Sequence, residues 1–294
     1  MTGLERDEDE IEASRAPLME HLVELRGRLV ICVVAFIIGF MACFYFAEPL
    51  YIFLVKPFAT AAAFHQSVGP GGHVSPLDLI LGTAGYKPLP GVDGQTVNLI
   101  YTAPLEFLFT KMKLAGFGAI VVAFPVLAWQ LYRFVAPGLY RNEKGAFLPF
   151  LLAAPLLFLL GAALVYFVML PFVMWFSLSQ QITAGGVSAA LLPKVSDYLN
   201  LVTALLLAFG LCFQLPVVMT LLGLAGIISS KAMAEGRRYA IMAVVVVAAV
   251  VTPPDPISQI MLAVPLVLLY EISIWCVRLI EFRRKKADAA EGLA

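Results

Sequence analysis

Charged residues are scarce in this 294-residue chain. Asp, Glu, Lys and Arg together make up only 14% of it, whereas a soluble globular domain has roughly 25%. Hydrophobic residues reach 61%, and the mean hydropathy is +0.90. The formal net charge of zero gives no basis for nucleic-acid binding. The composition therefore predicts an integral membrane protein.

Groups that perform catalysis or hold cofactors are also few. The three histidines, His21, His65 and His73, all lie outside the middle of the long apolar segments, which excludes haem ligation or a histidine metal site inside a helical bundle. The sequence has no glycine-rich phosphate loop, nucleophile-elbow serine or pair of intramembrane aspartates. The four cysteines show no metal-ligand spacing, and their places in apolar segments predict that the thiols are buried. We therefore expect no enzymatic activity, no metal and no cofactor.

Six apolar segments are candidates for membrane helices. Because a hydrocarbon core of about 30 Å needs about 20 helical residues, the sequence predicts an all-α membrane domain over residues 29–280. Its expected spans are at about 29–46, 105–131, 147–176, 198–228, 239–251 and 257–280. The fifth segment reaches only about 20 Å as a helix. It is either re-entrant or, as we expect, one of two short antiparallel spans that thin the bilayer locally.

Basic residues are distributed unequally between the loops. With six spans, 15 of the 20 lysine and arginine residues fall on the side of both termini. By the positive-inside rule, we expect a cytoplasmic N-terminal segment at 1–28 and a cytoplasmic tail at 281–294. The acidic, polar N-terminus differs from a cleaved signal peptide. The stretch 48–103, rich in Gly and Pro, is expected outside as an irregular cap.

Proline recurs inside the predicted spans. Because proline removes a backbone hydrogen bond, each one tends to bend its helix, and bent helices form a curved wall more readily than a straight bundle. Proline is also common in membrane helices without such a role, so both interpretations stay open. The positions are Pro125, Pro155, Pro171, Pro216 and Pro265.

Charged groups beside or within the spans are the best functional candidates, because burying a charge costs about 3 kcal/mol. Glu24, in HLVELRGR at 21–28, precedes the first span and can pair with Arg28 at i+4. Glu143 ends the basic, aromatic loop RFVAPGLYRNE at 133–143. For both acids, a local ion pair at the surface is the alternative to a binding role.

Four polar residues fall in or beside the later spans. Asp255, followed by Pro256, is typical of a helix N-cap. Glu271 either pairs with a basic group or faces a partner helix. Gln214 needs hydrogen-bond partners in hydrocarbon, so it either faces protein or a polar cavity or makes an interhelical contact within this chain. Gln259 is a further polar candidate near the start of the last span.

Four motifs combine into one pattern. They are HLVELRGRL at 21–29, FPVLAWQLYRFVAPGLYRNEK at 124–144, FGLCFQLPVV at 209–218 and TPPDPISQ at 252–259. Their order and their places relative to the spans closely resemble the TatC family, the six-span core subunit of the twin-arginine protein translocase. The resemblance covers about residues 18–284. It implies a concave, glove-like wall of bent helices in a bacterial inner membrane.

The resemblance also implies a function. A TatC protein receives precursors whose signal peptides carry two adjacent arginines, and it supports their proton-gradient-driven export in folded form. Acids in the N-terminal segment and the first cytoplasmic loop read the arginines, and the matching positions here are Glu24 and Glu143. Guanidinium presents a planar fork to a carboxylate, whereas lysine offers a point charge. Four further residues are expected to shape the loop or to orient Glu24: Phe134, Pro137, Tyr140 and Arg26.

Partners follow from the same resemblance. The single-span subunits TatA and TatB dock on the final spans and the fourth, within a larger complex that contains several copies. Many relatives have glutamate where this chain has Gln214. Because glutamine cannot exchange a proton, we expect a hydrogen-bonding role in partner assembly at this position.

Two other functions compete with this interpretation. A secondary transporter needs a substrate site near the middle of the membrane, and the scarcity of charge in the second to fifth spans opposes it. A haem- or quinone-bearing respiratory subunit is the other alternative, and the lack of histidines in the middle of the spans opposes the haem.

Overall fold

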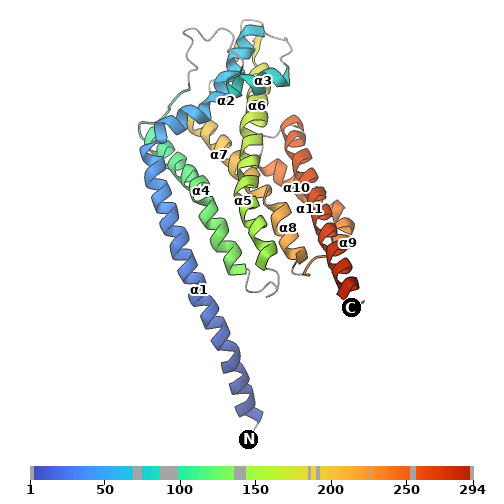
Figure 1. Ribbon diagram of the computed structural model, residues 1–294. Helices are drawn as coiled ribbons and strands as arrows, with labels where there is room; N and C mark the ends of the chain where they lie inside the picture. The colour runs from blue at the N-terminus through green and yellow to red at the C-terminus, as the bar shows by residue number, and fades with distance from the viewer. Residues whose placement is uncertain are drawn as a thin grey trace.

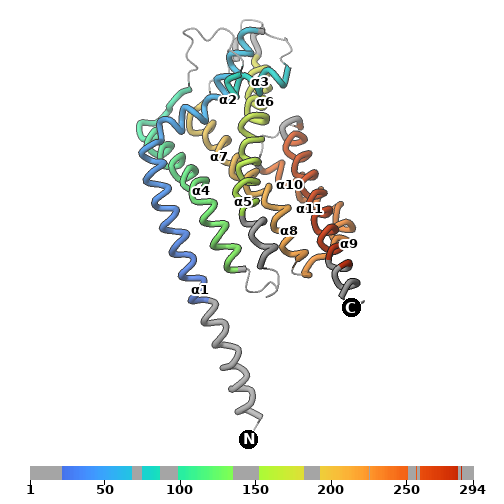
Figure 2. Tube along the Cα trace, in the orientation of Figure 1, coloured from blue at the N-terminus to red at the C-terminus, as the bar shows by residue number. Residues whose placement is uncertain are grey.

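The chain folds into a bundle of long helices capped at one end by two shorter ones (Figure 1). The computed structural model describes residues 3–68, 75–86, 99–135, 144–184, 187–189, 193–224, 226–251 and 256–291. Figure 2 traces the path of the chain from α1 to α11. The all-helical membrane architecture expected from the composition is confirmed, with one addition. A small antiparallel hairpin, β1 (Ile182–Ala184) and β2 (Val187–Ala189), follows α6.

Five stretches of the described chain are long and apolar enough to cross a membrane. They are 22–45, 106–134, 152–179, 195–224 and 259–283. They belong to α1 (Gly3–Tyr45), α4 (Glu106–Val135), α5 (Lys144–Leu164) with α6 (Leu170–Ser179), α7 (Val195–Cys212) with α8 (Leu215–Leu224), and α11 (Pro256–Glu291). These stretches overlap the first four predicted spans and the sixth.

The fifth predicted span corresponds to α10 (Arg237–Val251), which follows the short α9 (Ser230–Glu235). At 15 residues, α10 is about 22 Å long, which is less than the hydrocarbon core of about 30 Å. The six-span count therefore stays a prediction. Two contacts show that α10 and α11 pack antiparallel. Arg237 at the start of α10 pairs with Glu271 in the middle of α11, and Gln259 near the start of α11 donates to the Val245 carbonyl farther along α10.

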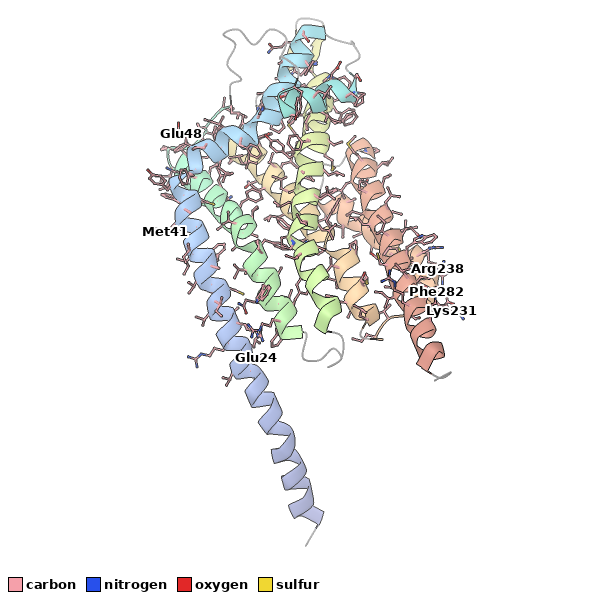
Figure 3. All side chains as sticks on the ribbon, viewed as in Figure 1. Glu24, Met41, Glu48, Lys231, Arg238 and Phe282 are labelled. Atoms are coloured by element: carbon pink, nitrogen blue, oxygen red, sulfur yellow. The ribbon has the colours of Figure 1, made fainter. Side chains whose placement is uncertain are left out.

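Two described parts of the stretch 48–103 are helical, unlike the expected irregular cap. They belong to α2 (Ala47–Val68) and α3 (Pro76–Ala84), which lie at the end of the bundle farthest from Glu24 (Figures 1 and 3). One face of α2, including Leu54, Phe58 and Ala61, is buried in the main core. The expectation was wrong for these residues because the apolar face of α2 packs against α6, and this packing outweighs the composition of the loop around it.

Two of the five expected prolines coincide with breaks in a helix. Pro171 has no N–H for the carbonyl four residues earlier, and it follows a π-helical turn at Val165–Met169, where Leu170 N–H bonds to the Val165 carbonyl. Pro216 follows the turn at 213–214 that separates α7 from α8. Both long apolar stretches are therefore interrupted midway.

Glycines allow the long helices to approach closely. A Cβ on Gly161 of α5 would lie 2.8 Å from the Phe209 carbonyl of α7, and one on Gly210 would lie 2.5 Å from the Phe158 ring. On the other side of the bundle, a Cβ on Gly39 of α1 would be 3.3 Å from Ala119 of α4. Small residues at crossing points are typical of membrane bundles, where contact between backbones replaces the hydrophobic effect.

Candidate functional site

Glu24 lies on α1 near the start of the stretch 22–45 (Figure 3). Its Oε1 accepts a hydrogen bond from Arg28 Nε at 3.1 Å, and a second nitrogen of the same guanidinium also contacts this oxygen. The Arg28 side chain is only 15% exposed, whereas that of Glu24 is 39% exposed. The expected i+4 pair is confirmed, and the Glu24 side chain remains partly exposed.

The packing of α1 on α4 places Glu24 opposite the end of α4. The two helices are antiparallel, and Gly39 lies against Ala119. Glu24 is 15 residues before Gly39, and Phe134 is 15 residues after Ala119. Because both helices rise by 1.5 Å per residue, Glu24 and Phe134 lie at the same level, where α4 ends at Val135.

The loop that follows α4 carries the other expected site residues. Phe134 is half-buried on the last turn of α4, whereas Pro137, Tyr140 and Glu143 lie outside the described residues. Arg26 is exposed on α1, two positions from Glu24. Residues two apart in a helix do not face each other, and the ion pair that the structure gives Glu24 is with Arg28.

Gln214 lies at the break between α7 and α8 and is only 8% exposed. Its Nε2 donates to the Ala154 carbonyl of α5 at 2.8 Å. Its Oε1 is buried and has no hydrogen-bond partner among the described residues. Of the two alternatives for this amide, the structure gives the contact with another helix of the same chain.

Glu271 pairs with a basic group, which was one of its two alternatives. Arg237, at the start of α10, contacts it through two nitrogens, with Nε–Oε1 at 2.7 Å and a terminal nitrogen to Oε2 at 2.8 Å. The neighbouring Tyr270 donates its hydroxyl to the Met233 carbonyl of α9 at 2.9 Å. Glu271 lies midway along the stretch 259–283, so α10 begins well inside the length of α11.

The start of α11 carries the last two predicted candidates. Gln259 Nε2 donates to the Val245 carbonyl of α10 at 3.3 Å, which joins the two final helices. Asp255 lies outside the described residues. Pro256 is the first residue of α11, the place that the N-cap prediction gave it.

Glu106 was missed by the sequence analysis. It is 8% exposed at the start of α4, where its Oε2 accepts from the backbone N–H of Thr102 at 2.8 Å and of Ala103 at 3.2 Å. Lys194 Nζ lies 3.6 Å from the same oxygen. A glutamate that reaches back to the backbone N–H three residues earlier, at the entry of a helix, is half of a capping box. The residue three positions before it is Ala103, where the capping-box signature has Ser or Thr, so the sequence carried no clear signal.

No group of three or more His, Cys, Asp or Glu side chains is arranged for a metal ion within the part of the chain that the structure describes. The four cysteines are free and half-buried. The Glu24 end presents charged and hydrogen-bonding side chains, namely those of Glu24 and Arg28.

Two relatives match nearly the whole chain. The Sec-independent protein translocase protein TatC of Magnetococcus marinus is 40% identical over 277 residues, which cover 94% of this chain and 89% of that protein. The protein of the same name from Aquifex aeolicus is 35% identical over 274 residues, which cover 93% of this chain and 100% of that protein.

A solved structure shares the fold. It is described as the crystal structure of the twin arginine translocase receptor TatC, and it matches with a TM-score of 0.67 and 35% identity over 88% of this chain and 98% of its own. The family model for the Sec-independent protein translocase protein (TatC) matches residues 20–265. The chain is thus a multi-pass membrane component of Sec-independent protein translocation, and it belongs to the TatC family.

Proposed function

We propose that this protein is the receptor and core subunit of a twin-arginine translocase. It binds Arg-Arg signal peptides through Glu24 and Glu143 and supports proton-gradient-driven export of folded proteins. The observation that carries this proposal is the partly exposed carboxylate of Glu24, at the level where α4 ends and the chain continues into the loop of Glu143.

The Glu24–Arg28 pair is compatible with an incoming arginine. A partly exposed ion pair contributes only about 0.5 kcal/mol, so exchanging or sharing the carboxylate costs little. A signal arginine offers Glu24 a second planar donor fork, which a lysine lacks. The receptor is therefore expected to prefer twin arginine over twin lysine.

Basic residues support placing the Glu24 end in the cytoplasm. In Figure 3, Glu24, Lys231 and Arg238 all lie toward the same end of the bundle. Lys56 and Lys194 belong to the opposite end, in α2 and just before α7. By the positive-inside rule, both termini are cytoplasmic in a bacterial inner membrane.

The final helices support a locally thin membrane. The bidentate Arg237–Glu271 pair lies midway along the apolar stretch of α11, and α10 reaches about 22 Å from this level. A bilayer that thins at α10 allows the helix to cross as a sixth span. It also suits a signal peptide, whose apolar region of roughly 7–15 residues is too short for a normal bilayer.

Partner docking is proposed on the last two helices. Val246 and Val250 of α10 are exposed, at 57% and 80%, and they offer an apolar face to single-span TatA and TatB within a complex of several copies. Gln214 supports partner docking from within the helical wall, because its side-chain amide donates a hydrogen bond to the Ala154 carbonyl of α5. The secondary-transporter alternative gains no support from the family relationship.

The test uses membranes that contain the full-length protein with a photo-crosslinker at Leu131, which is 61% exposed near the end of α4, so that Glu143 stays in place. A twin-arginine precursor should crosslink, and its twin-lysine counterpart should crosslink at least about tenfold less. Glu24→Gln should reduce crosslinking of the twin-arginine precursor, whereas Glu235→Gln, at an exposed acid of α9, should not.

Equal crosslinking of the two precursors would refute the receptor role. A Glu24→Gln protein that crosslinks normally would remove Glu24 from the site and leave the family membership unchanged.

A further inference from the structure

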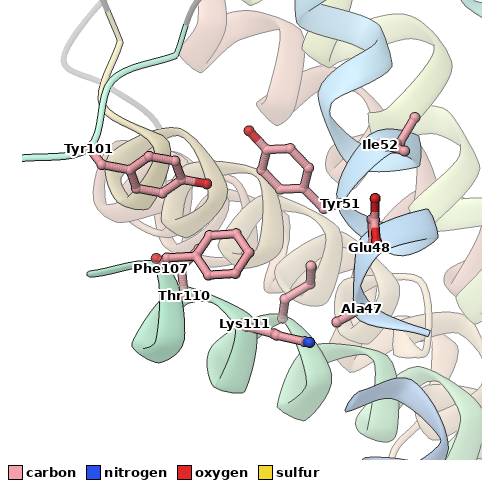
Figure 4. A pocket seen from close by; sticks show the side chains of 9 residues that line it. Ala47, Glu48, Tyr51, Ile52, Tyr101, Phe107, Thr110 and Lys111 are labelled. Atoms are coloured by element: carbon pink, nitrogen blue, oxygen red, sulfur yellow. The ribbon is translucent and has the colours of Figure 1, made fainter. Parts of the chain in front are cut away.

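A cavity of about 410 Å³ lies between α2, α4 and the segment 101–107, at the end of the bundle opposite Glu24 (Figure 4). This size is within the range of small-molecule sites. Nine residues line it: Ala47, Glu48, Tyr51, Ile52, Tyr101, Phe107, Thr110, Lys111 and Leu114. None of them belongs to the candidate site at the Glu24 end.

The cavity is at the level where a membrane ends. The apolar stretch of α1 ends at Tyr45, two residues before the cavity, and that of α4 begins at Glu106, within the lining segment. Large aromatic side chains surround this level, with Tyr45 81% exposed and Phe109 58% exposed. Exposed aromatic rings at both ends of membrane spans mark the headgroup region.

The charged side chains of the cavity are not paired with each other. Lys111 is half-buried, and its ammonium lies 5.0 Å from the centroid of the Phe44 ring. Among the described residues, no carboxylate lies within ion-pair distance of this ammonium. Glu48 is exposed in the first turn of α2. In Figure 4 the Lys111 ammonium extends toward Ala47, next to Glu48. A lysine inside a membrane stretch needs an anionic partner or a path to water.

The other side chains that line the cavity are of two kinds, polar and apolar. Hydroxyl groups of Tyr51, Tyr101 and Thr110 supply hydrogen bonds, and burial together with Tyr101 raises the pKa of Tyr51 to about 12, so this hydroxyl stays a neutral donor. Ile52 and Phe107 are exposed, at 62% and 56%, beside the polar part. One ligand that suits this arrangement has a phosphate, a cation and apolar chains.

We propose that this cavity binds the headgroup of phosphatidylethanolamine from the outer leaflet. The phosphate pairs with Lys111, the primary ammonium pairs with Glu48, and the acyl chains run along Ile52 and Phe107. Phosphatidylglycerol has no cation for Glu48. Phosphatidylcholine carries a quaternary ammonium without N–H donors, so it loses the charge-assisted hydrogen bond. The inference depends on the cavity and its level in the membrane, and not on the proposed receptor role; only the assignment to the outer leaflet rests on the proposed orientation.

The test uses purified, delipidated full-length protein in a mild detergent. Phosphatidylethanolamine, phosphatidylglycerol and phosphatidylcholine with identical acyl chains are added in turn, and native mass spectrometry measures the lipid retained. Wild-type protein should retain phosphatidylethanolamine best. Lys111→Gln should weaken retention of all phospholipids about tenfold or more, because a hydrogen-bonded charge contact is lost.

Two variants separate this site from non-specific lipid binding. Glu48→Gln should abolish the preference for phosphatidylethanolamine over phosphatidylglycerol while keeping the phosphate contact. Lys113→Gln is the matched control, because Lys113 is exposed and does not line the cavity. Its Nζ donates to Asn200 Oδ1 at 3.4 Å. Lys111→Arg keeps the positive charge and should retain lipid, which distinguishes a lost contact from a misfolded variant.

Two results would overturn the proposal. One is an unchanged lipid preference in Glu48→Gln. The other is equally tight binding of soluble glycerophosphoethanolamine, which would make the cavity a site for a water-soluble phosphate compound.

Discussion

Tyr166 donates its hydroxyl hydrogen to the backbone carbonyl of Phe53, with the two oxygens 2.7 Å apart. Pro57 lies four residues after Phe53 inside α2 and has no N–H, so it cannot make the helical bond to this carbonyl. The Tyr166 and Phe53 rings also stack, with centroids 4.3 Å apart. A tyrosine of the π-helical turn thus replaces the bond that proline removes and joins α2 to the bundle.

Tyr166→Phe should lower the stability of the protein by about 1 to 2 kcal/mol, because the Phe53 carbonyl loses its donor from outside the helix. In the Pro57→Ala background the same change should cost less, since the introduced alanine supplies the missing N–H. Thermal unfolding in detergent measures both, with a shift of roughly 2 to 4 °C per kcal/mol. An equal cost of Tyr166→Phe in the two backgrounds would show that the proline-freed carbonyl is not the reason for this contact.

Gly161→Ala should destabilise the packing of α5 on α7. The added methyl would lie 2.8 Å from both the Phe209 carbonyl and the Phe213 ring, and overpacking of this kind costs about 1 to 3 kcal/mol. Gly116→Ala is the matched control, since nothing lies within 4 Å of its Cβ position. It should be neutral or stabilising by up to about 1 kcal/mol, because alanine is the better helix former. The thermal midpoint should therefore fall in Gly161→Ala and stay the same or rise in Gly116→Ala, and an equal fall in both variants would contradict the close contact.

Glu106→Gln should weaken the junction between α4 and α7. The neutral amide loses the charge that strengthens the bonds from Thr102 and Ala103 and attracts Lys194, and bonds to a charged group contribute about 1.5 to 3 kcal/mol. Protease sensitivity of the 99–105 segment and the thermal midpoint report the change. Glu235→Gln, which alters an exposed acid, should leave both measurements unchanged. A similar small effect in the two variants would mean that Glu106 is only a surface charge.

Local features were the part of this molecule that the sequence predicted well. Helical spacing placed Arg28 beside Glu24 because both partners lie on one helix. The apolar runs located the first four membrane stretches and α11, because about 20 consecutive apolar residues are a strong signal for a membrane helix. The turn at Gln214 lies just before Pro216, one of the five prolines for which the sequence left open whether the helix bends.

Contacts between distant segments could not be predicted in this way. The many Gly and Pro residues of 48–103 made this stretch look irregular, but α2 packs on other helices, whose Tyr166 and Tyr198 hydroxyls donate to its Phe53 and Leu54 carbonyls. The choice of Ala154 as the partner of Gln214 likewise depends on how α5 packs on α7. Helical periodicity gives the side of a helix that is buried, and it does not identify the neighbour.

The short α10 gives the last prediction, which concerns topology. At 15 residues it reaches about 22 Å and crosses the membrane only where the bilayer is thin. Single cysteines at Lys231 and Val250, in a protein whose four native cysteines are replaced by alanine, should differ in reaction with a membrane-impermeant maleimide on spheroplasts. Val250→Cys lies one residue from the end of α10 and is 80% exposed, so it should react from outside. Lys231→Cys, on α9, should react only after permeabilisation. If both cysteines required permeabilisation, α10 would enter the membrane without crossing it, and α11 would return the chain to the same side. The six-span prediction would then be wrong.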